Sequence, residues 1–267
     1  MKKVTLVKLG GAILTDKRKP QLIRQNLLEE LVGQIQESLP FLGSELVIGN
    51  GGGSFGHYYA QKYGLLNGMV DEKGYLGFCK GKNGNALLNR RLVNAFISRG
   101  MKACSYLMDP IFYVFGEMGE AMKNWHLLFN YLSNGIIPVV YGDFVYDCEK
   151  GCRIISTEEI FSSLITAILT DSSYGYCVDK IVFCTDKDGV LDQAGQILPI
   201  IKREEFRQWD IFEMHKEGYD VTGGMLGKVK MALNPTFHFP VYIINGNHPG
   251  RLGGLLRGNE VIGTKIY

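Results

Sequence analysis

The sequence lacks the features that would place it in a membrane or on nucleic acid. No stretch approaches the roughly 20 consecutive apolar residues of a membrane-spanning helix. The formal net charge of the 267 residues is only +2, which is too small to predict a nucleic-acid-binding surface. Lys8 interrupts the apolar run that follows the basic start, and no small-residue cleavage site follows. We therefore expect a cytoplasmic protein that binds neither membranes nor nucleic acid.

Cysteines are also few, with six in the whole chain. A chain of this length can bury a sizeable core without disulfides, so reduced and buried thiols are expected. Cys148 and Cys152 are four residues apart, but no second pair stands at a spacing typical of zinc sites. The sequence therefore predicts neither a disulfide framework nor a protein-bound metal.

Two familiar phosphate-binding signatures are missing, namely the G-x-x-x-x-G-K-[ST] loop and the protein-kinase motif set. A G-x-G-x-x-G pattern is present at Gly51, Gly53 and Gly56, with Asp71 at about the distance expected of a dinucleotide-binding protein. This pattern follows the second expected strand rather than the first, and no clear strand precedes Asp71. A dinucleotide site is therefore the less favoured interpretation.

Short β-rich runs alternate with helical patterns along the chain. The expected strands are Val4–Lys8, Glu45–Ile48, Ile136–Tyr141, Lys180–Cys184, Val241–Ile244 and Val261–Tyr267, with a hairpin over Phe144–Ile155. The expected helices are Asn26–Ser38, one capped by Ser54, Ala86–Ile97, Glu158–Leu169 and Thr222–Leu233. The weakly patterned segment Gly64–Asn85 predicts a mobile loop or lid. The alternation predicts an α/β fold with a mainly parallel sheet between two layers of helices.

Polar clusters follow the expected strands or open the expected helices. They are Lys8–Gly11 with Lys17 nearby, Gly51–His57, Tyr141–Asp143, Thr185–Val190, and Asp220–Met225 with Lys228 beyond it. Ligands of open α/β sheets bind at the carboxyl ends of the strands. Glycines let backbone amides approach phosphate oxygens, and lysines add positive charge. Each cluster alone also fits an ordinary turn, but together they predict a phosphate-binding site.

Two of these residues have a structural and a functional interpretation. Lys8 stands in an apolar strand, which is costly unless the ammonium snorkels to solvent or has an anionic partner. His57 is either a structural histidine or a donor to an anion, because it follows amides at an expected helix N-terminus.

These motifs, in this order along nearly the whole chain, resemble the amino-acid kinase superfamily, and within it the isopentenyl phosphate kinase family. The continuation of the glycine segment into Phe55–His57 is the most discriminating piece, because members that act on amino acids typically lack that histidine. Fosfomycin kinases share it and form the alternative. The C-terminal residues Gly263–Ile266 also resemble the isopentenyl phosphate kinase family.

The resemblance implies a homodimer of single-domain chains with a three-layer α/β/α sandwich. Residues 1–267 would form that domain, with an acceptor-binding part at about 1–170 and a nucleotide-binding part at about 171–267. The implied reaction uses ATP with Mg²⁺ and converts isopentenyl phosphate, a small-molecule phosphate acceptor, to isopentenyl diphosphate and ADP. No side chain need act as a strong base, since a phosphate acceptor is already an anion; positioning and charge neutralisation suffice.

The same resemblance assigns roles by position. The implied catalytic residues are Lys8, Lys17, His57 and Lys228. The residues implied to bind the acceptor phosphate are Gly52, His57 and Gly142. The residues implied to bind ATP are Lys8, Gly10, Gly11, Gly53, Asp186, Gly224 and Lys228.

Two departures from the family pattern bear most on the site. Ser156–Glu158 replaces the usual Ser-Gly-Asp, whose aspartate is thought to orient the catalytic lysine, so Glu158 keeps the charge with a longer reach. Lys80–Asn85 is polar where the family has a helix lining the acceptor pocket. Either this polar face points to solvent, or the acceptor is more polar than isopentenyl phosphate. The apolar candidates for the pocket wall are Phe78, Leu87, Leu107, Met108 and Ile111.

Overall fold

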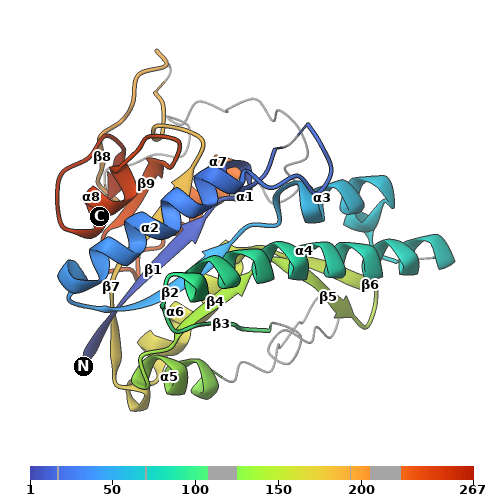
Figure 1. The fold of residues 1–267 in the computed structure, drawn as a ribbon, viewed down its shortest axis with the longest axis horizontal. Coiled ribbons are helices and arrows are strands. Elements are labelled where there is room, and N and C mark those ends of the chain that lie inside the picture. Colours follow the sequence, from blue (N-terminus) through green and yellow to red (C-terminus); the bar gives the residue numbers. More distant parts are fainter. Residues whose placement is uncertain (17, 70, 108–124, 193, 205–223) are drawn as a thin grey trace.

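A mainly parallel sheet of eight strands forms the centre of the molecule (Figure 1). The computed structural model describes residues 1–16, 18–69, 71–107, 125–192, 194–204 and 224–267. The strand order is β3-β4-β2-β1-β7-β9-β10-β8, and among these neighbours only β9 and β10 pair antiparallel. The strands are β1 (Lys2–Leu9), β2 (Glu45–Asn50), β3 (Ala103–Ser105), β4 (Ile137–Tyr141), β7 (Tyr176–Thr185), β8 (Ile200–Ile201), β9 (Val241–Asn245) and β10 (Thr264–Ile266).

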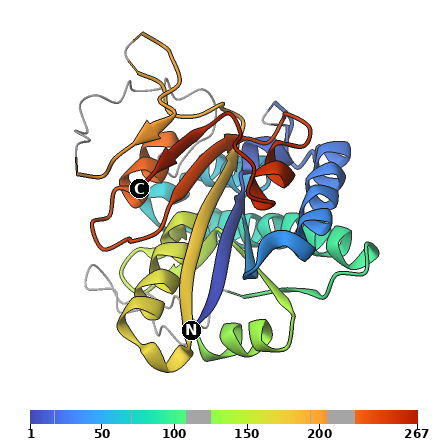
Figure 2. The same ribbon diagram turned by 90° about the vertical axis from the view of Figure 1, so that its left-hand side faces the viewer.

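Helices cover both faces of this sheet, as the alternating sequence pattern predicts (Figure 2). One face carries α2 (Gln25–Leu42), α4 (Glu72–Ser98) and α8 (Arg251–Leu256), and the other carries α5 (His126–Ser133), α6 (Thr157–Thr170) and α7 (Gly224–Ala232). The central strand β1 is buried on both sides, so neighbouring side chains enter different cores: Leu6 joins the α5–α7 side and Val7 the α2–α4 side. The three-layer α/β/α prediction is confirmed.

Most of the remaining elements lie around the carboxyl ends of the central strands. Helix α1 (Gly11–Leu14) follows β1, and α3 (Gly53–Lys62) follows β2. The hairpin of β5 (Asp143–Asp147) and β6 (Gly151–Ile155) follows β4 and turns at residues 148–150, as predicted. Two short 3₁₀ turns, η1 (Leu65–Asn67) and η2 (Ser172–Tyr174), complete the described elements.

The prediction of a loop or lid over Gly64–Asn85 is wrong. Most of this segment is the first half of α4, a helix of 27 residues that begins after the N-cap Asp71. The side chain of Asp71 accepts a hydrogen bond from the Gly74 amide at 2.7 Å. Glycine has low helix propensity, but here it permits close packing: a Cβ atom on Gly77 would lie 2.4 Å from Cβ of Tyr63, and one on Gly81 2.4 Å from the Phe144 ring.

Several boundaries also differ from the sequence predictions. Helix α3 begins at Gly53 with Gly52 as N-cap, so Ser54 is inside the helix and does not cap it. Strand β10 covers only Thr264–Ile266, and α2 continues through Pro40 to Leu42. The short elements α1, α5, α8, β3 and β8 were not predicted, because runs of two to eight residues give little periodic signal.

The strand register aligns the predicted polar clusters along one edge of the sheet. Leu9 at the end of β1 pairs with Asn50 of β2 and with Cys184 of β7. Asn50 in turn pairs with Tyr141 of β4, and Thr185 pairs with Asn245 of β9. The segments after β1, β2, β4 and β7 therefore start at the same level, where ligands of such sheets bind.

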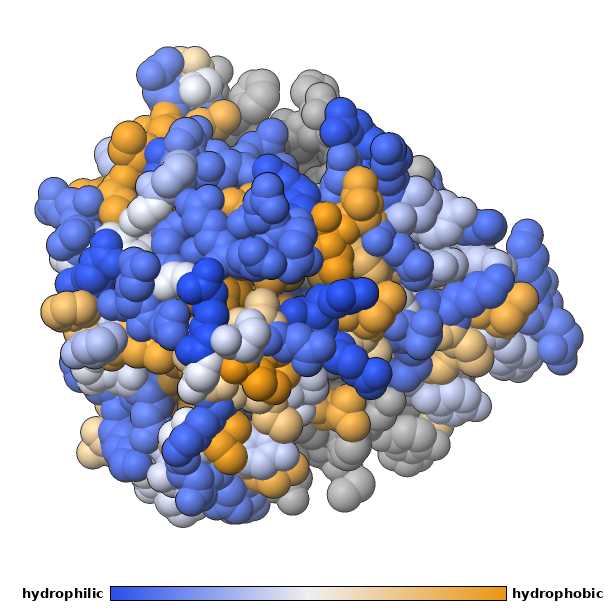
Figure 3. Space-filling view, viewed as in Figure 1, coloured by the Kyte–Doolittle hydropathy of each residue, from blue (hydrophilic) through white to orange (hydrophobic). Residues whose placement is uncertain are grey.

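Polar side chains dominate the face of the molecule seen in Figure 3, and apolar ones are scattered among them. None of the helices in the described part of the chain is both long enough and apolar enough to span a membrane.

Candidate functional site

The two glycine segments after β1 and β2 touch each other at the sheet edge. A Cβ atom on Gly11 would lie only 2.3 Å from the amide nitrogen of Gly53, so neither loop leaves room for a larger residue there. Gly53 also has a φ of +51°, a conformation that side chains disfavour. The close contact places backbone of both segments beside Lys8, the residue two positions before Gly10.

A buried carboxylate joins two of the predicted catalytic lysines. The ammonium of Lys8 donates a hydrogen bond to Oε2 of Glu158, and Nζ of Lys228 lies 3.3 Å from Oε1 of the same carboxylate. The three side chains are 7%, 10% and 12% exposed for Lys8, Glu158 and Lys228. Burial alone would raise the pKa of Glu158, but the two ammonium groups outweigh it and lower the pKa to about 2. The carboxylate is therefore ionised at neutral pH.

The start of α6 explains how Glu158 reaches this position. Ser156 is the N-cap, its side chain accepts from the Glu159 amide, and the Glu159 side chain accepts from the Ser156 amide. This capping box fixes the first helical turn, which contains Glu158. A helix N-terminus also favours a negative side chain. Glu158 thus reaches both lysines from the first turn of α6.

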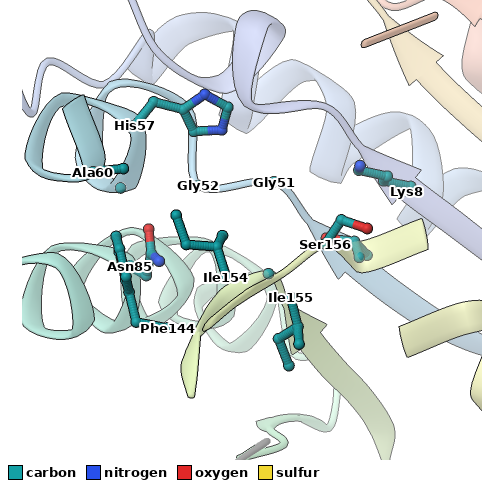
Figure 4. A pocket seen from close by; sticks show the side chains of 13 residues that line it. Lys8, Gly51, Gly52, His57, Ala60, Asn85, Phe144, Ile154, Ile155 and Ser156 are labelled. Atoms are coloured by element: carbon teal, nitrogen blue, oxygen red, sulfur yellow. The ribbon is translucent and has the colours of Figure 1, made fainter. Parts of the chain in front are cut away.

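A small cavity opens beside Lys8 (Figure 4). Its polar lining consists of Lys8, Gly51, Gly52, Gly56, His57, Asn85, Gly142, Ser156 and Thr157. Its apolar lining consists of Ala60, Phe144, Ile154 and Ile155. In Figure 4, Lys8 and Ser156 lie toward one end of the cavity, Ala60 and Asn85 toward the other, and His57 opposite Ile154. A ligand with a charged head and an apolar tail fits such a lining.

The structure brings all three predicted acceptor residues to this cavity. Gly52 and Gly142 line it, and so does the half-buried His57 on α3. The Gly142 amide donates to the carbonyl of Asn50 at 3.2 Å, and the Gly10 amide donates to the carbonyl of Cys184 at 2.8 Å. These two glycines therefore shape the site with their backbone, while their N–H groups hold strand ends together.

The nucleotide residues predicted near the C-terminal half lie at neighbouring strand and helix ends. Asp186 follows β7 and lines a surface hollow that also contains Gly189 and Gln196. Gly224 opens α7 with a φ of +52°, and its carbonyl accepts a hydrogen bond from Lys228 at 2.9 Å. Lys17 lies outside the described residues, as do positions 220–223 of the predicted Asp220–Met225 cluster.

The polar stretch Lys80–Asn85 divides between solvent and the interior. Lys80 and Asn83 are exposed. Lys82 donates to Oδ2 of Asp143 at 2.9 Å, and the Asn85 amide donates to Oδ1 of Asp143 at 3.2 Å. Neither a polar face that points to solvent nor a more polar acceptor is sufficient alone as an interpretation. Half of these side chains, Lys82 and Asn85, form a network with Asp143 beside the cavity.

The predicted apolar wall is only partly supported. Leu87 and Leu107 are exposed, at 39% and 62%, so they do not form a pocket wall. Phe78 packs on Phe144, and Met108 and Ile111 lie outside the described residues.

Several lining residues were missed by the sequence predictions. Asn85, Ser156 and Thr157 contribute polar groups, and Ile154 contributes apolar surface. The capping pattern Ser156-x-x-Glu159 was the one local signal that marks part of this wall.

Asp71, the acidic residue of the dinucleotide pattern, caps α4 and does not follow a strand. None of the six cysteines forms a disulfide, as expected, but only Cys152 and Cys184 are buried, so the expectation of buried thiols is wrong for the other four. Among the residues that the structure describes, no three His, Cys, Asp or Glu side chains gather in a group that could hold a metal ion.

The chain resembles known proteins in both sequence and fold. The model of the amino acid kinase family matches residues 3–245. Isopentenyl phosphate kinases of Methanothermobacter thermautotrophicus and Methanocaldococcus jannaschii are each 29% identical to the chain, and each alignment covers 98% of both proteins. A solved structure of isopentenyl phosphate kinase superposes with a TM-score of 0.77 at 26% identity, covering 98% of this chain and 100% of the other.

Proposed function

Because this chain belongs to the amino acid kinase family, we propose that it transfers the γ-phosphate of ATP to isopentenyl phosphate. The relatives that align over their full length carry this activity in their names. The observation that supports it most directly is the Lys8–Glu158–Lys228 cluster beside a cavity with a polar and an apolar part.

The lysine cluster is suited to neutralise a transferring phosphoryl group. Two lysines and one glutamate leave one net positive charge in a largely buried place. Phosphoryl transfer depends mainly on positioning and on charge neutralisation around the γ-phosphate. Lys8 borders the cavity, whereas Lys228 extends from α7, so they approach the transferring group from the acceptor side and from the nucleotide side. Lys17 is proposed to join them.

The acceptor phosphate is proposed to lie against Gly52 and His57, with Gly142 shaping the floor. The apolar tail then faces Ala60, Phe144, Ile154 and Ile155. Each buried methylene contributes about 0.8 kcal/mol, so this wall favours a prenyl tail over a tail-less phosphate. The acceptor-binding part thus corresponds to about residues 1–170.

The nucleotide is proposed to occupy the side formed by about residues 171–267. Gly11 and Gly53 place backbone groups where their two loops meet, and Gly10 belongs to the same turn as Gly11. Asp186 and Gly224 line the nucleotide side at the ends of β7 and α7.

In the proposed reaction an oxygen of isopentenyl phosphate attacks the γ-phosphorus of ATP. The bond from that phosphorus to the bridging oxygen breaks, ADP leaves, and isopentenyl diphosphate forms. No general base is needed, because a phosphate monoester is largely ionised near neutral pH. His57 donates to the acceptor phosphate and fixes its direction, which makes the in-line approach more frequent.

Magnesium is proposed as the companion of ATP. The described residues offer no cluster of three carboxylate, thiol or imidazole groups, and Glu158 is already paired with two lysines. Mg²⁺ commonly binds through substrate phosphates and few protein ligands. Phosphate oxygens of ATP would therefore hold it, and it would supply charge neutralisation there.

We also propose that the chain acts as a homodimer in the cytoplasm. The homodimer rests on the family resemblance, and the location rests on the sequence, in which no apolar run reaches the length of a membrane span. Light scattering of the purified protein measures the mass in solution, and a mass near 30 kDa, that of one 29.8 kDa chain, would contradict the dimer.

A coupled ADP-release assay tests the activity. Purified protein is given Mg-ATP with isopentenyl phosphate, dimethylallyl phosphate, fosfomycin or small polar phosphates. We expect turnover to be strongest with isopentenyl phosphate. Turnover with fosfomycin or polar phosphates alone would replace the proposed acceptor and make the buried polar network around Asp143 a substrate-selecting feature.

A further inference from the structure

Asn85 is a buried polar residue in the wall of the acceptor cavity. It lies on α4, is 3% exposed, and borders the same space as Gly52 and His57 (Figure 4). No motif of the family resemblance includes it. The nitrogen and the oxygen of its side-chain amide have different surroundings, and both affect the position of the glycine segment after β2.

The nitrogen side of the Asn85 amide faces a buried carboxylate. Nδ2 donates to Oδ1 of Asp143 at 3.2 Å, while Lys82 donates to Oδ2 of Asp143 at 2.9 Å and to the Phe144 carbonyl at 2.8 Å. Burial raises the pKa of Asp143, and the ion pair with Lys82 only partly offsets this rise. The nitrogen is the donor atom of the Asn85 amide, and Oδ1 of Asp143 is its acceptor, so the nitrogen is turned toward Asp143.

The oxygen of the Asn85 amide consequently faces α3. Oδ1 of Asn85 is buried and has no hydrogen-bond partner in the described part of the protein. A Cβ atom on Gly52 would lie 2.6 Å from this oxygen, and one on Gly56 only 2.3 Å. A buried oxygen without a partner is unfavourable, so the hydrogen bond to Asp143 is what holds the side chain in this place.

We propose that Asn85 is a positioning residue for the acceptor phosphate, acting as a spacer between α4 and the glycine segment Gly52–Gly56. Asp143 and Lys82 hold the spacer, and Gly52 and His57 transmit its position to the acceptor. This inference rests on the proposed function of the cavity. It also explains why positions 52 and 56 have no side chain, since Asn85 fills the space that a side chain would need.

The spacer is expected to affect the acceptor and not ATP. In Asn85→Ala the first turn of α3 can move toward α4, and shifts of about 1 Å in a positioning group can cost about a hundredfold in rate. We expect the KM for isopentenyl phosphate to rise about tenfold or more, with the KM for ATP within about twofold of wild type. Asn83→Ala is the matched control, because Asn83 is exposed on the same helix.

Lys82→Met provides a second variant, which removes the ammonium that holds Oδ2 of Asp143 and leaves Asn85 in place. We expect the same selective rise in the acceptor KM, so the inference remains testable if Asn85→Ala does not fold. Equal effects on acceptor and ATP, or a lower melting temperature with an unchanged acceptor KM in both variants, would overturn the spacer role.

Calorimetric titration of isopentenyl phosphate without ATP distinguishes a failure of the proposed function from a failure of the inference about Asn85. A wild-type protein that does not bind isopentenyl phosphate contradicts the proposed function. A wild type that binds, together with an Asn85→Ala protein that binds equally well, contradicts the inference alone. We expect wild type to bind and the variant to bind about tenfold more weakly.

Discussion

At the scale of single residues, Glu158 has an environment that few carboxylates share. Its two oxygens are divided between Lys8 and Lys228, which come from β1 and α7. Removing one partner from a buried charge cluster leaves the others uncompensated, which is strongly destabilising. The cluster therefore links the position of two proposed catalytic residues to a single side chain.

Glu158→Gln tests this link through the rate. The amide cannot balance two ammonium groups, so the lysines are expected to separate and kcat to fall on the order of a hundredfold. Steady-state kinetics with Glu37→Gln as control, an exposed glutamate on α2, measure the effect. A Glu158→Gln enzyme with wild-type kcat would show that the lysines are placed by other contacts.

Acid stability provides an independent prediction for the same residue. The pKa of Glu158 is lowered from 4.5 to about 2, so its ionised form stabilises the fold above about pH 4.5. This contribution disappears as the pH falls from about 4.5 toward 2. Urea unfolding of wild type should show that loss, and Glu158→Gln should show less of it. Parallel stability curves for the two proteins would contradict the lowered pKa.

His57 is predicted to act on the acceptor and not on ATP. His57→Ala removes a donor at the edge of the cavity, and hydrogen bonds to charged groups contribute roughly 1.5–3 kcal/mol. The acceptor KM should rise about tenfold to a hundredfold, while ATP affinity changes little. The exposed His238→Ala is the control. A loss confined to ATP affinity would remove His57 from the acceptor site.

The sequence predicts some of these residues better than others. Lys8, Gly52 and His57 belong to local motifs, and the structure places all three at one cavity. The pair Asn85–Asp143 is 58 residues apart in sequence and carries no local signal. Such a contact depends on how α4 lies against the hairpin, which no short pattern encodes.

At the scale of elements, α4 is where packing overrides local preference. Its buried glycines, at 74, 77, 81 and 84, lower helix propensity, and for this reason the sequence indicates a loop. The same glycines let the helix approach Tyr63 on the α3 side and Phe144 on β5. By contrast, the strands that end in polar clusters were predicted, because buried parallel strands give continuous apolar runs.

Gly77→Ala tests the packing of α4. Alanine is the better helix former, but its Cβ would lie 2.4 Å from Cβ of Tyr63, close to the backbone and unable to swing away. We expect a loss of about 1–3 kcal/mol in the free energy of unfolding. Gly33→Ala in α2 is the matched control, since its Cβ would meet only the flexible tip of Arg99 at 3.3 Å. Stabilisation by both substitutions would contradict the close packing of α4.

At the scale of the whole molecule, the site is assembled by the sheet. The carboxyl ends of β4, β2, β1 and β7 lie at the same level, which brings the proposed acceptor and nucleotide sides together. Glu158 contacts Lys8 of β1 and Lys228 of α7 between these two sides. The cavity and the lysine cluster share Lys8, so the proposed acceptor lies next to the cluster. Transfer between two bound phosphates is the chemistry that this proximity favours.

The most direct measurement is ³¹P NMR of the product formed from isopentenyl phosphate and Mg-ATP. We predict two coupled diphosphate resonances from isopentenyl diphosphate, appearing with ADP in wild type and lost in both Lys8→Ala and Lys228→Ala. Release of ADP and free phosphate without a new diphosphate ester would contradict the proposed transfer. So would a diphosphate product that forms equally well in the lysine variants.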